Sequence, residues 1–210
     1  MREALLRARG VARRYGSHVA LEPTDIDVCE GEALALIGPN GAGKSTLLSI
    51  LAGALAPSAG HVERVGGVRV GWVPQRPAFY DRLTARENLA LFARLEAEAR
   101  PASVAERLLA RFDVPADRPA HTLSVGNRQR LNVALALLGE PRVLLLDEPT
   151  ASLDPGQRRR LWEIVTALRD EGGAVVFVTQ NLEELDLHAD RVVAMEQGRL
   201  VPAGAEQVFS

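Results

Sequence analysis

A glycine-rich loop constrains the fold of this chain more than any other segment. Residues 38–46 read Gly-Pro-Asn-Gly-Ala-Gly-Lys-Ser-Thr, between the apolar run Ala33–Ile37 and a segment expected to be helical from Ser45 to about Leu55. Glycines let several backbone N–H groups converge on phosphate oxygens, and the start of the following helix adds a favourable dipole. The order of strand, loop and helix therefore predicts a triphosphate-binding loop. Its predicted ligand-binding residues are Gly38, Pro39, Asn40, Gly41, Ala42, Gly43, Lys44, Ser45 and Thr46.

Two side chains of this loop carry the expected chemistry. Lys44 is predicted to reach the β- and γ-phosphates, and Ser45 to ligate Mg²⁺. Lys44 is also the only lysine in a chain whose other strongly basic residues are all arginine. An ammonium is a compact charge on a thin stem, whereas a guanidinium is broad. A lone lysine at this position therefore indicates a cramped phosphate site.

A pair of acidic residues follows the apolar run Val143–Leu146. Such a run is typical of a strand buried on both faces of a parallel sheet, and its carboxyl end opens into the ligand crevice of the sheet. We expect Asp147 to hold Mg²⁺ and Glu148 to act as general base towards the attacking water. Together with the glycine-rich loop, these acids predict a nucleoside triphosphatase.

The order of the remaining elements predicts one α/β domain over residues 1–210. Further strands are expected at Asp25–Cys29, Ala174–Thr179 and Arg191–Met195, a hairpin around Gly66-Gly67 within His61–Val73, and a short helix at Leu182–Leu187. Alternating strands and helices favour a mostly parallel sheet. Capping boxes at Thr84 and Ser103, and the potential cap Ser124, instead predict helices. We therefore expect residues 1–75 and 138–210 to form a catalytic core and residues 76–137 a helical subdomain.

Composition excludes several other classes of protein. The net charge of about −2 gives no basic field for nucleic acid, so no nucleic-acid partner is expected. The single cysteine, Cys29, excludes an internal disulfide. No stretch reaches the roughly 18 apolar residues of a membrane-spanning helix, which favours a soluble, cytosolic protein.

The segment Leu123–Asn127, followed by Arg128-Gln129-Arg130, resembles the signature motif of the ABC transporter ATPases. The resemblance extends over essentially the whole chain. It implies the fold of that family: a P-loop core with a mostly parallel sheet, a small antiparallel β region and a helical subdomain. It also implies that Ser124 and Gly126 face the γ-phosphate held by another subunit.

The resemblance assigns roles to further residues. Tyr15 stands where the family stacks an aromatic ring on adenine, and Gln75 where a glutamine contacts Mg²⁺ and senses the transmembrane partner. Ser152-Leu153-Asp154 resembles the loop that crosses the dimer interface. The segment 80–89 resembles the exporter-like subgroup.

Two positions depart from the usual family pattern. Val125 and Asn127 replace the commonest signature residues, although Ser124 and Gly126 remain. Gln180 stands where a histidine usually contacts the γ-phosphate. An amide donates a hydrogen bond but carries no proton charge, so Gln180 places the rate of hydrolysis in question more than ATP binding.

The resemblance implies an ATP-hydrolysing subunit that powers a transporter whose transmembrane part is a separate chain. Its implied partners are that permease and a second ATPase subunit, identical or not, which together form an ATP-sandwich dimer at the cytoplasmic face of the membrane. Two alternatives remain open at this stage. One is a soluble ATPase acting on DNA, ribosomes or iron–sulfur assembly, and the other is a nucleotide switch without turnover.

Overall fold

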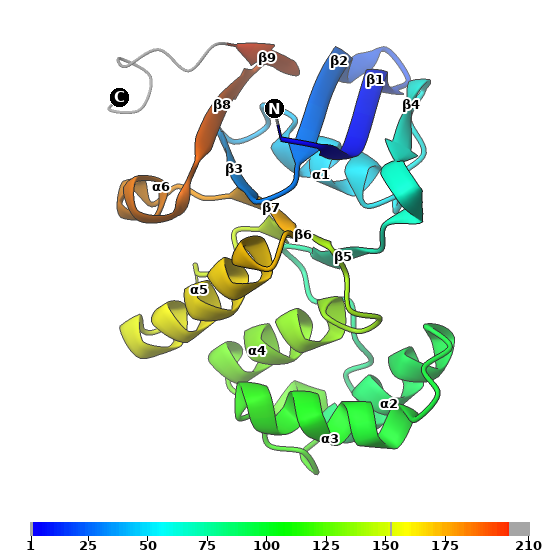
Figure 1. Ribbon diagram of the computed structural model, residues 1–210, viewed down its shortest axis with the longest axis vertical. Coiled ribbons are helices and arrows are strands. Elements are labelled where there is room, and N and C mark those ends of the chain that lie inside the picture. Colours follow the sequence, from blue (N-terminus) through cyan, green and yellow to red (C-terminus); the bar gives the residue numbers. More distant parts are fainter. Residues whose placement is uncertain (1, 152, 202–210) are drawn as a thin grey trace.

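The computed structural model describes residues 2–151 and 153–201 and contains two β-sheets with helices around them (Figure 1). The larger sheet has six strands in the order β5 (Val70–Val73), β6 (Val143–Asp147), β7 (Ala174–Val178), β3 (Glu32–Ile37), β8 (Arg191–Glu196) and β9 (Arg199–Val201). All neighbouring pairs are parallel except β8 with β9. The mostly parallel sheet expected from the sequence is thus confirmed.

The smaller sheet is antiparallel and has the order β2 (His18–Cys29), β1 (Ala4–Tyr15), β4 (Ala59–Arg64). Sequence patterns did not indicate β1, and β2 begins seven residues before the predicted Asp25. The predicted hairpin in His61–Val73 is wrong, because β4 pairs with β1 whereas β5 pairs with β6 of the other sheet. Gly66, with φ of 63°, marks a turn between two sheets and not a hairpin turn.

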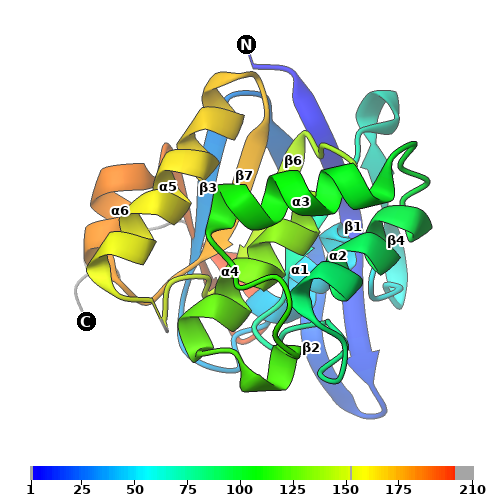
Figure 2. The same ribbon diagram turned by 90° about the horizontal axis from the view of Figure 1, so that it is seen from below.

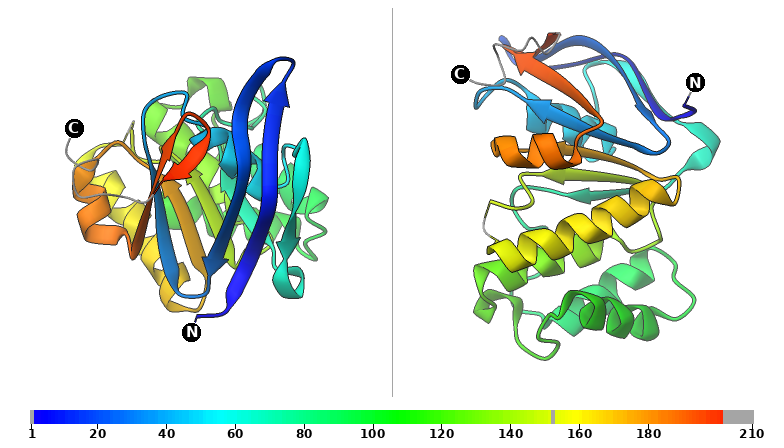
Figure 3. Two further views of the ribbon diagram at one scale, coloured as in Figure 1. Left: turned by 90° about the horizontal axis from the view of Figure 1, so that it is seen from above. Right: turned by 60° about the vertical axis from the view of Figure 1, so that its left-hand side comes forward.

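Alternate residues of the central strands enter two separate apolar cores. In β3, Ala33, Ala35 and Ile37 pack on one side of the sheet, while Leu34 and Leu36 pack on the other. This alternation follows from the two-residue period of a strand. The right view of Figure 3 shows the resulting layers: the antiparallel sheet with helix α1 (Lys44–Leu51) above the parallel sheet, and helix α5 (Pro155–Asp170) below it. Helix α6 (Leu182–His188) connects β7 to β8.

Three helices, α2 (Ala85–Leu95), α3 (Pro101–Phe112) and α4 (Val125–Ala136), gather at the end of the molecule away from the antiparallel sheet (Figure 1) and lie in front when the molecule is seen from below (Figure 2). At the start of α2, Thr84 Oγ1 accepts from the Glu87 backbone N–H and Glu87 Oε2 accepts from the Thr84 N–H, so both bonds of the capping box are formed. The capping box predicted at Ser103 is wrong, because α3 begins at Pro101, whose fixed φ suits the first turn. The exact division at residues 76 and 137 stays a prediction.

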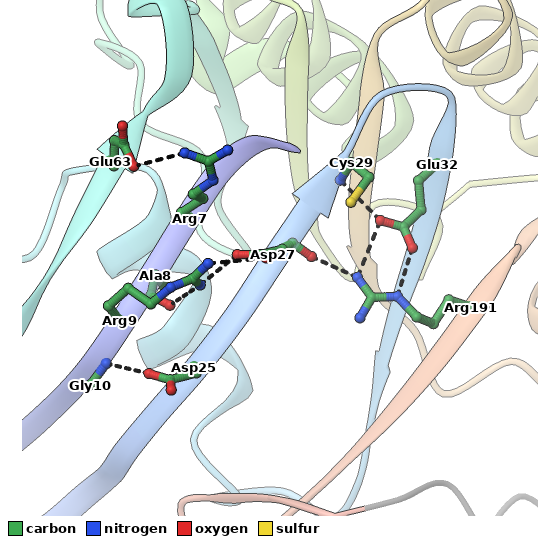
Figure 4. Close-up of polar contacts among 10 residues, drawn as sticks. All are labelled: Arg7, Ala8, Arg9, Gly10, Asp25, Asp27, Cys29, Glu32, Glu63 and Arg191. Carbon is green, nitrogen blue, oxygen red and sulfur yellow. Dashed lines mark hydrogen bonds and ion pairs between the residues drawn. The ribbon is translucent and has the colours of Figure 1, made fainter. Parts of the chain in front are cut away.

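An ion pair between the partly exposed Arg191 and the buried Glu32 ties β8 to the first residue of β3 (Figure 4). Arg191 donates from Nε to Glu32 Oε1 (2.6 Å) and from Nη2 to Glu32 Oε2 (3.2 Å) and to the Asp27 carbonyl (2.6 Å). Glu32 Oε2 also accepts from the backbone N–H of Cys29 at 3.0 Å. One buried carboxylate therefore joins three strands.

Removing this carboxylate is expected to destabilise the fold. We expect Glu32→Ala to lower the free energy of unfolding by about 2 kcal/mol, because it leaves the Cys29 N–H without its acceptor and leaves the Arg191 side chain with the Asp27 carbonyl but no carboxylate. Glu63→Ala is the matched control, since Glu63 and its partner Arg7 are both exposed and 3.4 Å apart, and a change within about 0.5 kcal/mol is expected there. Urea unfolding of both variants measures the difference, and equal losses would contradict the role given to Glu32.

Candidate functional site

The glycine-rich loop leaves the carboxyl end of β3 and enters α1, as predicted from its pattern. Gly38 and Gly43 have φ values of 136° and 102°, a region that favours glycine. A Cβ on Gly38 would overlap the carbonyl oxygen of Met195 in β8, and one on Gly43 would lie 2.6 Å from the carbonyl oxygen of Ala20 in β2. The shape of the loop therefore depends on both glycines.

The side chain of Lys44 is folded into this loop and Lys44 is only 6% exposed. Its Nζ donates to the carbonyl oxygens of Gly38 (2.7 Å) and Pro39 (2.9 Å). Burial lowers the pKa of Lys44, while the negative charges of Glu148 and Asp147 oppose that shift. The loop thus holds a compact positive charge against the carbonyl oxygens of its own backbone.

The two acids occupy different environments at the end of β6. Asp147 is buried, and burial raises its pKa, while a hydrogen bond with the Ser45 side chain opposes the shift. The hydroxyl and carboxylate predicted to bind Mg²⁺ therefore lie within hydrogen-bond reach of each other, and oxygen ligands of this kind suit that ion. Glu148 follows with φ of 50°, and its N–H donates to the Val178 carbonyl at 3.1 Å.

Two amide side chains hold the carboxylate of Glu148. Gln180 Nε2 donates to Glu148 Oε1 at 3.0 Å and to Asn40 Oδ1 at 3.2 Å. Gln75 Nε2 donates to Glu148 Oε2 at 3.4 Å. Residues separated by more than a hundred positions in the chain thus meet at the carboxyl edge of the parallel sheet.

Most of the predicted site residues line one cleft of about 530 Å³, but the predicted residues Gly38, Pro39, Ala42 and Asp147 are not among its lining. Its lining comprises Tyr15, His18, Ala20, Asn40, Gly41, Gly43, Lys44, Ser45, Thr46, Gln75, Glu148, Val178 and Gln180. A second cleft of equal volume lies between α3 and α5 and contains none of the predicted site residues. The candidate site is therefore identified by the residues that line it and not by its volume.

The cleft also contains residues that sequence reasoning missed. His18 and Ala20 come from the first residues of β2, next to the turn at Gly16, and the Arg13 guanidinium lies over the Tyr15 ring at 4.6 Å from its centre. Tyr15 and His18 face each other across that turn as the last pair of β1 and β2. If β1 had been recognised in the sequence, its pairing with β2 would have placed the residues after the turn beside Tyr15.

Ser124 and Gly126 are not part of this cleft. Ser124 caps α4, with its Oγ accepting from the Asn127 N–H at 3.2 Å. A Cβ on Gly126 would lie 2.5 Å from Oε1 of Gln157 in α5, so a larger residue there would displace the end of that side chain. Ser152 lies outside the described residues, while Leu153 is buried and Asp154 caps α5 by accepting from the Gln157 N–H at 2.9 Å.

Comparison with known sequences decides the family. The sequence profile described as ABC transporter matches residues 21–151, from β2 through the acids that follow β6. The chain belongs to the ABC transporter family. It is an ATP-binding ATPase of that family, which confirms the resemblance found in the sequence.

Several relatives of this ABC ATPase have known names. Daunorubicin resistance ATP-binding protein DrrA3 of Streptomyces coeruleorubidus is 39% identical, with 97% of this chain and 69% of the relative covered. Nod factor export ATP-binding protein I of Burkholderia orbicola is 38% identical, with 94% of this chain and 69% of the relative covered. ATP-binding cassette sub-family A member 7 of Mus musculus is 39% identical over 90% of this chain, which spans 9% of that protein. Names of resistance and export agree with the exporter-like resemblance.

Solved structures have the same fold as this ABC ATPase. An ATP-binding subunit of an ABC transporter superposes with a TM-score of 0.81 at 28% identity, covering 95% of this chain and 89% of that chain. A dimeric bacterial ABC transporter cassette superposes with a TM-score of 0.84 at 25% identity, covering 94% and 97%.

Proposed function

We propose that this chain is the ATP-hydrolysing subunit of an exporter whose membrane-spanning part is a separate chain. The observation that carries the proposal is the carboxylate of Glu148, which two amides hold in the cleft that also contains Lys44. A carboxylate fixed beside a phosphate-binding loop is suited to take a proton from an attacking water. The neighbouring Asp147 is buried and accepts a hydrogen bond from Ser45, so the two acids have different tasks.

We assign the other side chains by the groups that they can reach. Lys44 and the N–H groups of the loop bind the phosphates, and Tyr15 stacks on the adenine. Ser45, Asp147 and Gln75 would hold Mg²⁺, which neutralises phosphate charge when bound. Gln180 would donate to the γ-phosphate by exchanging the hydrogen bond that its amide makes with Asn40. Because Gln180 stays neutral, we expect slower hydrolysis than with a histidine at this position.

We further propose that two such chains close head to tail on two ATP molecules. The cleft supplies donors to the γ-phosphate from one side only, and the start of α4 with Ser124 and Gly126 does not line it. A helix start presents free N–H groups to an anion, and here Ser124 is exposed to solvent. A two-fold axis would place this helix start of each chain over the cleft of the other.

The transmembrane partner is proposed from the relatives and from one surface feature. Among residues 2–151 and 153–201, no helix is long and apolar enough to cross a bilayer. The relatives' names include resistance and export. Tyr80 is 57% exposed and its ring lies beside that of Phe92. It belongs to the segment after Gln75, which we propose as the docking surface for a permease at the cytoplasmic face of the membrane.

A binding experiment tests this partner. We expect Tyr80→Asp to reduce recovery of a membrane protein with the tagged chain by about tenfold, because exposed aromatic residues often dominate interfaces. The matched control is Leu187→Asp on α6, where Leu187 is 67% exposed and far from the proposed surface in sequence. Recovery is measured by mild-detergent pull-down and mass spectrometry, with ATP binding measured in parallel.

Two results would count against the proposal. Equal recovery of the membrane protein by both variants would refute the docking surface. Recovery of no membrane protein by the unsubstituted chain would refute the exporter subunit and favour a soluble nucleotide switch.

A further inference from the structure

A buried carboxyl group lies directly behind the turn that carries Gln180. Glu184, in α6, is only 4% exposed. Its Oε2 accepts a hydrogen bond of 2.7 Å from Thr179 Oγ1, and its Oε1 is buried with no hydrogen-bond partner among the residues that the structure describes. A buried polar atom without a partner costs stability, so an apolar side chain of similar volume would pack there at lower cost. Stability alone does not account for a glutamate at this position.

The partner of Glu184 organises the turn between β7 and α6. Thr179 is buried at the end of β7, and its Oγ1 accepts from the Asn181 N–H at 3.0 Å while it donates to Glu184. Asn181 in turn caps α6, because its Oδ1 accepts from the Glu183 N–H at 3.0 Å. Hydrogen bonds therefore fix the residues on both sides of Gln180.

Gln180 itself is exposed, and its side chain points into the cleft. The hydrogen bonds of its amide go to Glu148 Oε1 and Asn40 Oδ1, both of which belong to the candidate site. Because Gln180 is exposed, these two hydrogen bonds and the backbone of the turn determine where its amide lies. An error of about 1 Å in the placement of such a group can change a rate by up to about a hundredfold.

We propose that Glu184 is a positioning residue, which holds the Gln180 amide against Glu148 and the γ-phosphate through the hydroxyl of Thr179. This inference rests on the proposed role of Gln180. Loss of the acceptor at Glu184 frees the Thr179 hydroxyl to rotate, and the Asn181 N–H then loses a fixed acceptor. These bonds of Glu184 and Thr179 do not reach the phosphate-binding loop, which meets the Gln180 side chain through the hydrogen bond to Asn40 Oδ1. We therefore expect ATP binding to change little while turnover falls.

Steady-state ATP hydrolysis by the full chain tests this inference with two pairs of substitutions. Glu184→Met, which preserves volume and removes the acceptor, is expected to lower kcat about tenfold with the KM for ATP within about twofold. Glu184→Gln keeps an acceptor oxygen and is expected to retain most of the kcat. Thr179→Val and Thr179→Ser form the second pair, in which only the serine keeps the hydroxyl. Melting temperatures of all four variants distinguish displacement of the Gln180 amide from a loss of folding.

A double-substitution cycle shows whether Glu184 acts through Gln180. In a Gln180→Ala background, Glu184→Met is expected to cause no further fall in kcat, because the group that it positions is gone. A full additional tenfold fall in that background, or an unchanged kcat for Glu184→Met alone, would overturn the inference while leaving the proposed role of Gln180 standing. An unchanged kcat for Gln180→Ala alone would overturn both.

Discussion

Glu148→Gln is expected to lower ATP turnover by about a hundredfold or more, because it preserves the shape of the side chain and removes its basicity. Both oxygens of Glu148 accept hydrogen bonds, one from Gln75 and one from Gln180, and a glutamine of the same shape still accepts one of them through its single amide oxygen. ATP remains bound because Lys44 and its loop are untouched. In the proposed head-to-tail arrangement the closed dimer then accumulates, and light scattering with and without ATP and Mg²⁺ measures it.

Ser124→Arg in the Glu148→Gln chain tests which surface closes that dimer. We expect the added arginine to prevent the ATP-dependent dimer by filling the exposed start of α4. Ser103→Arg makes the same change at another exposed position in a neighbouring helix, α3, and is expected to leave the dimer intact. A trapped dimer that survives Ser124→Arg unchanged would show that the start of α4 does not face the second ATP.

Lys44→Arg is expected to weaken ATP binding by about a hundredfold although it keeps the charge. Lys44 Nζ lies 2.7 Å and 2.9 Å from two carbonyl oxygens of its own loop, and the space around it suits a thin stem. Losing two charge-assisted hydrogen bonds to phosphate, at about 1.5 kcal/mol each, corresponds to that change in affinity. Equilibrium binding of a fluorescent ATP analogue measures it.

An arginine-to-lysine substitution on an exposed helix face provides the control for Lys44→Arg. Arg94 is exposed near the end of α2, and Arg94→Lys is expected to leave ATP affinity unchanged. Unchanged affinity in Lys44→Arg would show that the lysine acts as a charge alone and that the cramped site inferred from the sequence is wrong.

The sequence predicted those parts of the fold that depend on residues close together in the chain. The runs that became β3, β6 and β7 are apolar throughout because both faces of each strand are buried. The cap of α2 was visible in Thr84 and Glu87, since both of its bonds join residues three apart. The glycine-rich loop was equally visible, because the residues that shape it are contiguous.

Pairing between distant segments could not be read in the same way. Four arginines interrupt β1, and the strand is held by partners on both sides, β2 and β4, the second of which is about fifty residues away. The turn at Gly66-Gly67 satisfied a local hairpin rule, but the apolar strand after it was more stable beside β6. The contact between Asn40 and Gln180 joins residues 140 positions apart, and only the assembled sheet brings them together.

The close fit of Gly38 and Gly43 has a genetic consequence. Gly38 rests on the backbone of β8 in the parallel sheet, Gly43 rests on the backbone of β2 in the antiparallel sheet, and the Ala42 carbonyl accepts from the N–H of Gly198. The loop therefore packs closely against strands of both sheets. We therefore expect selection for loss of ATP binding to recover substitutions in β2 and β8 whose own side chains do not line the cleft.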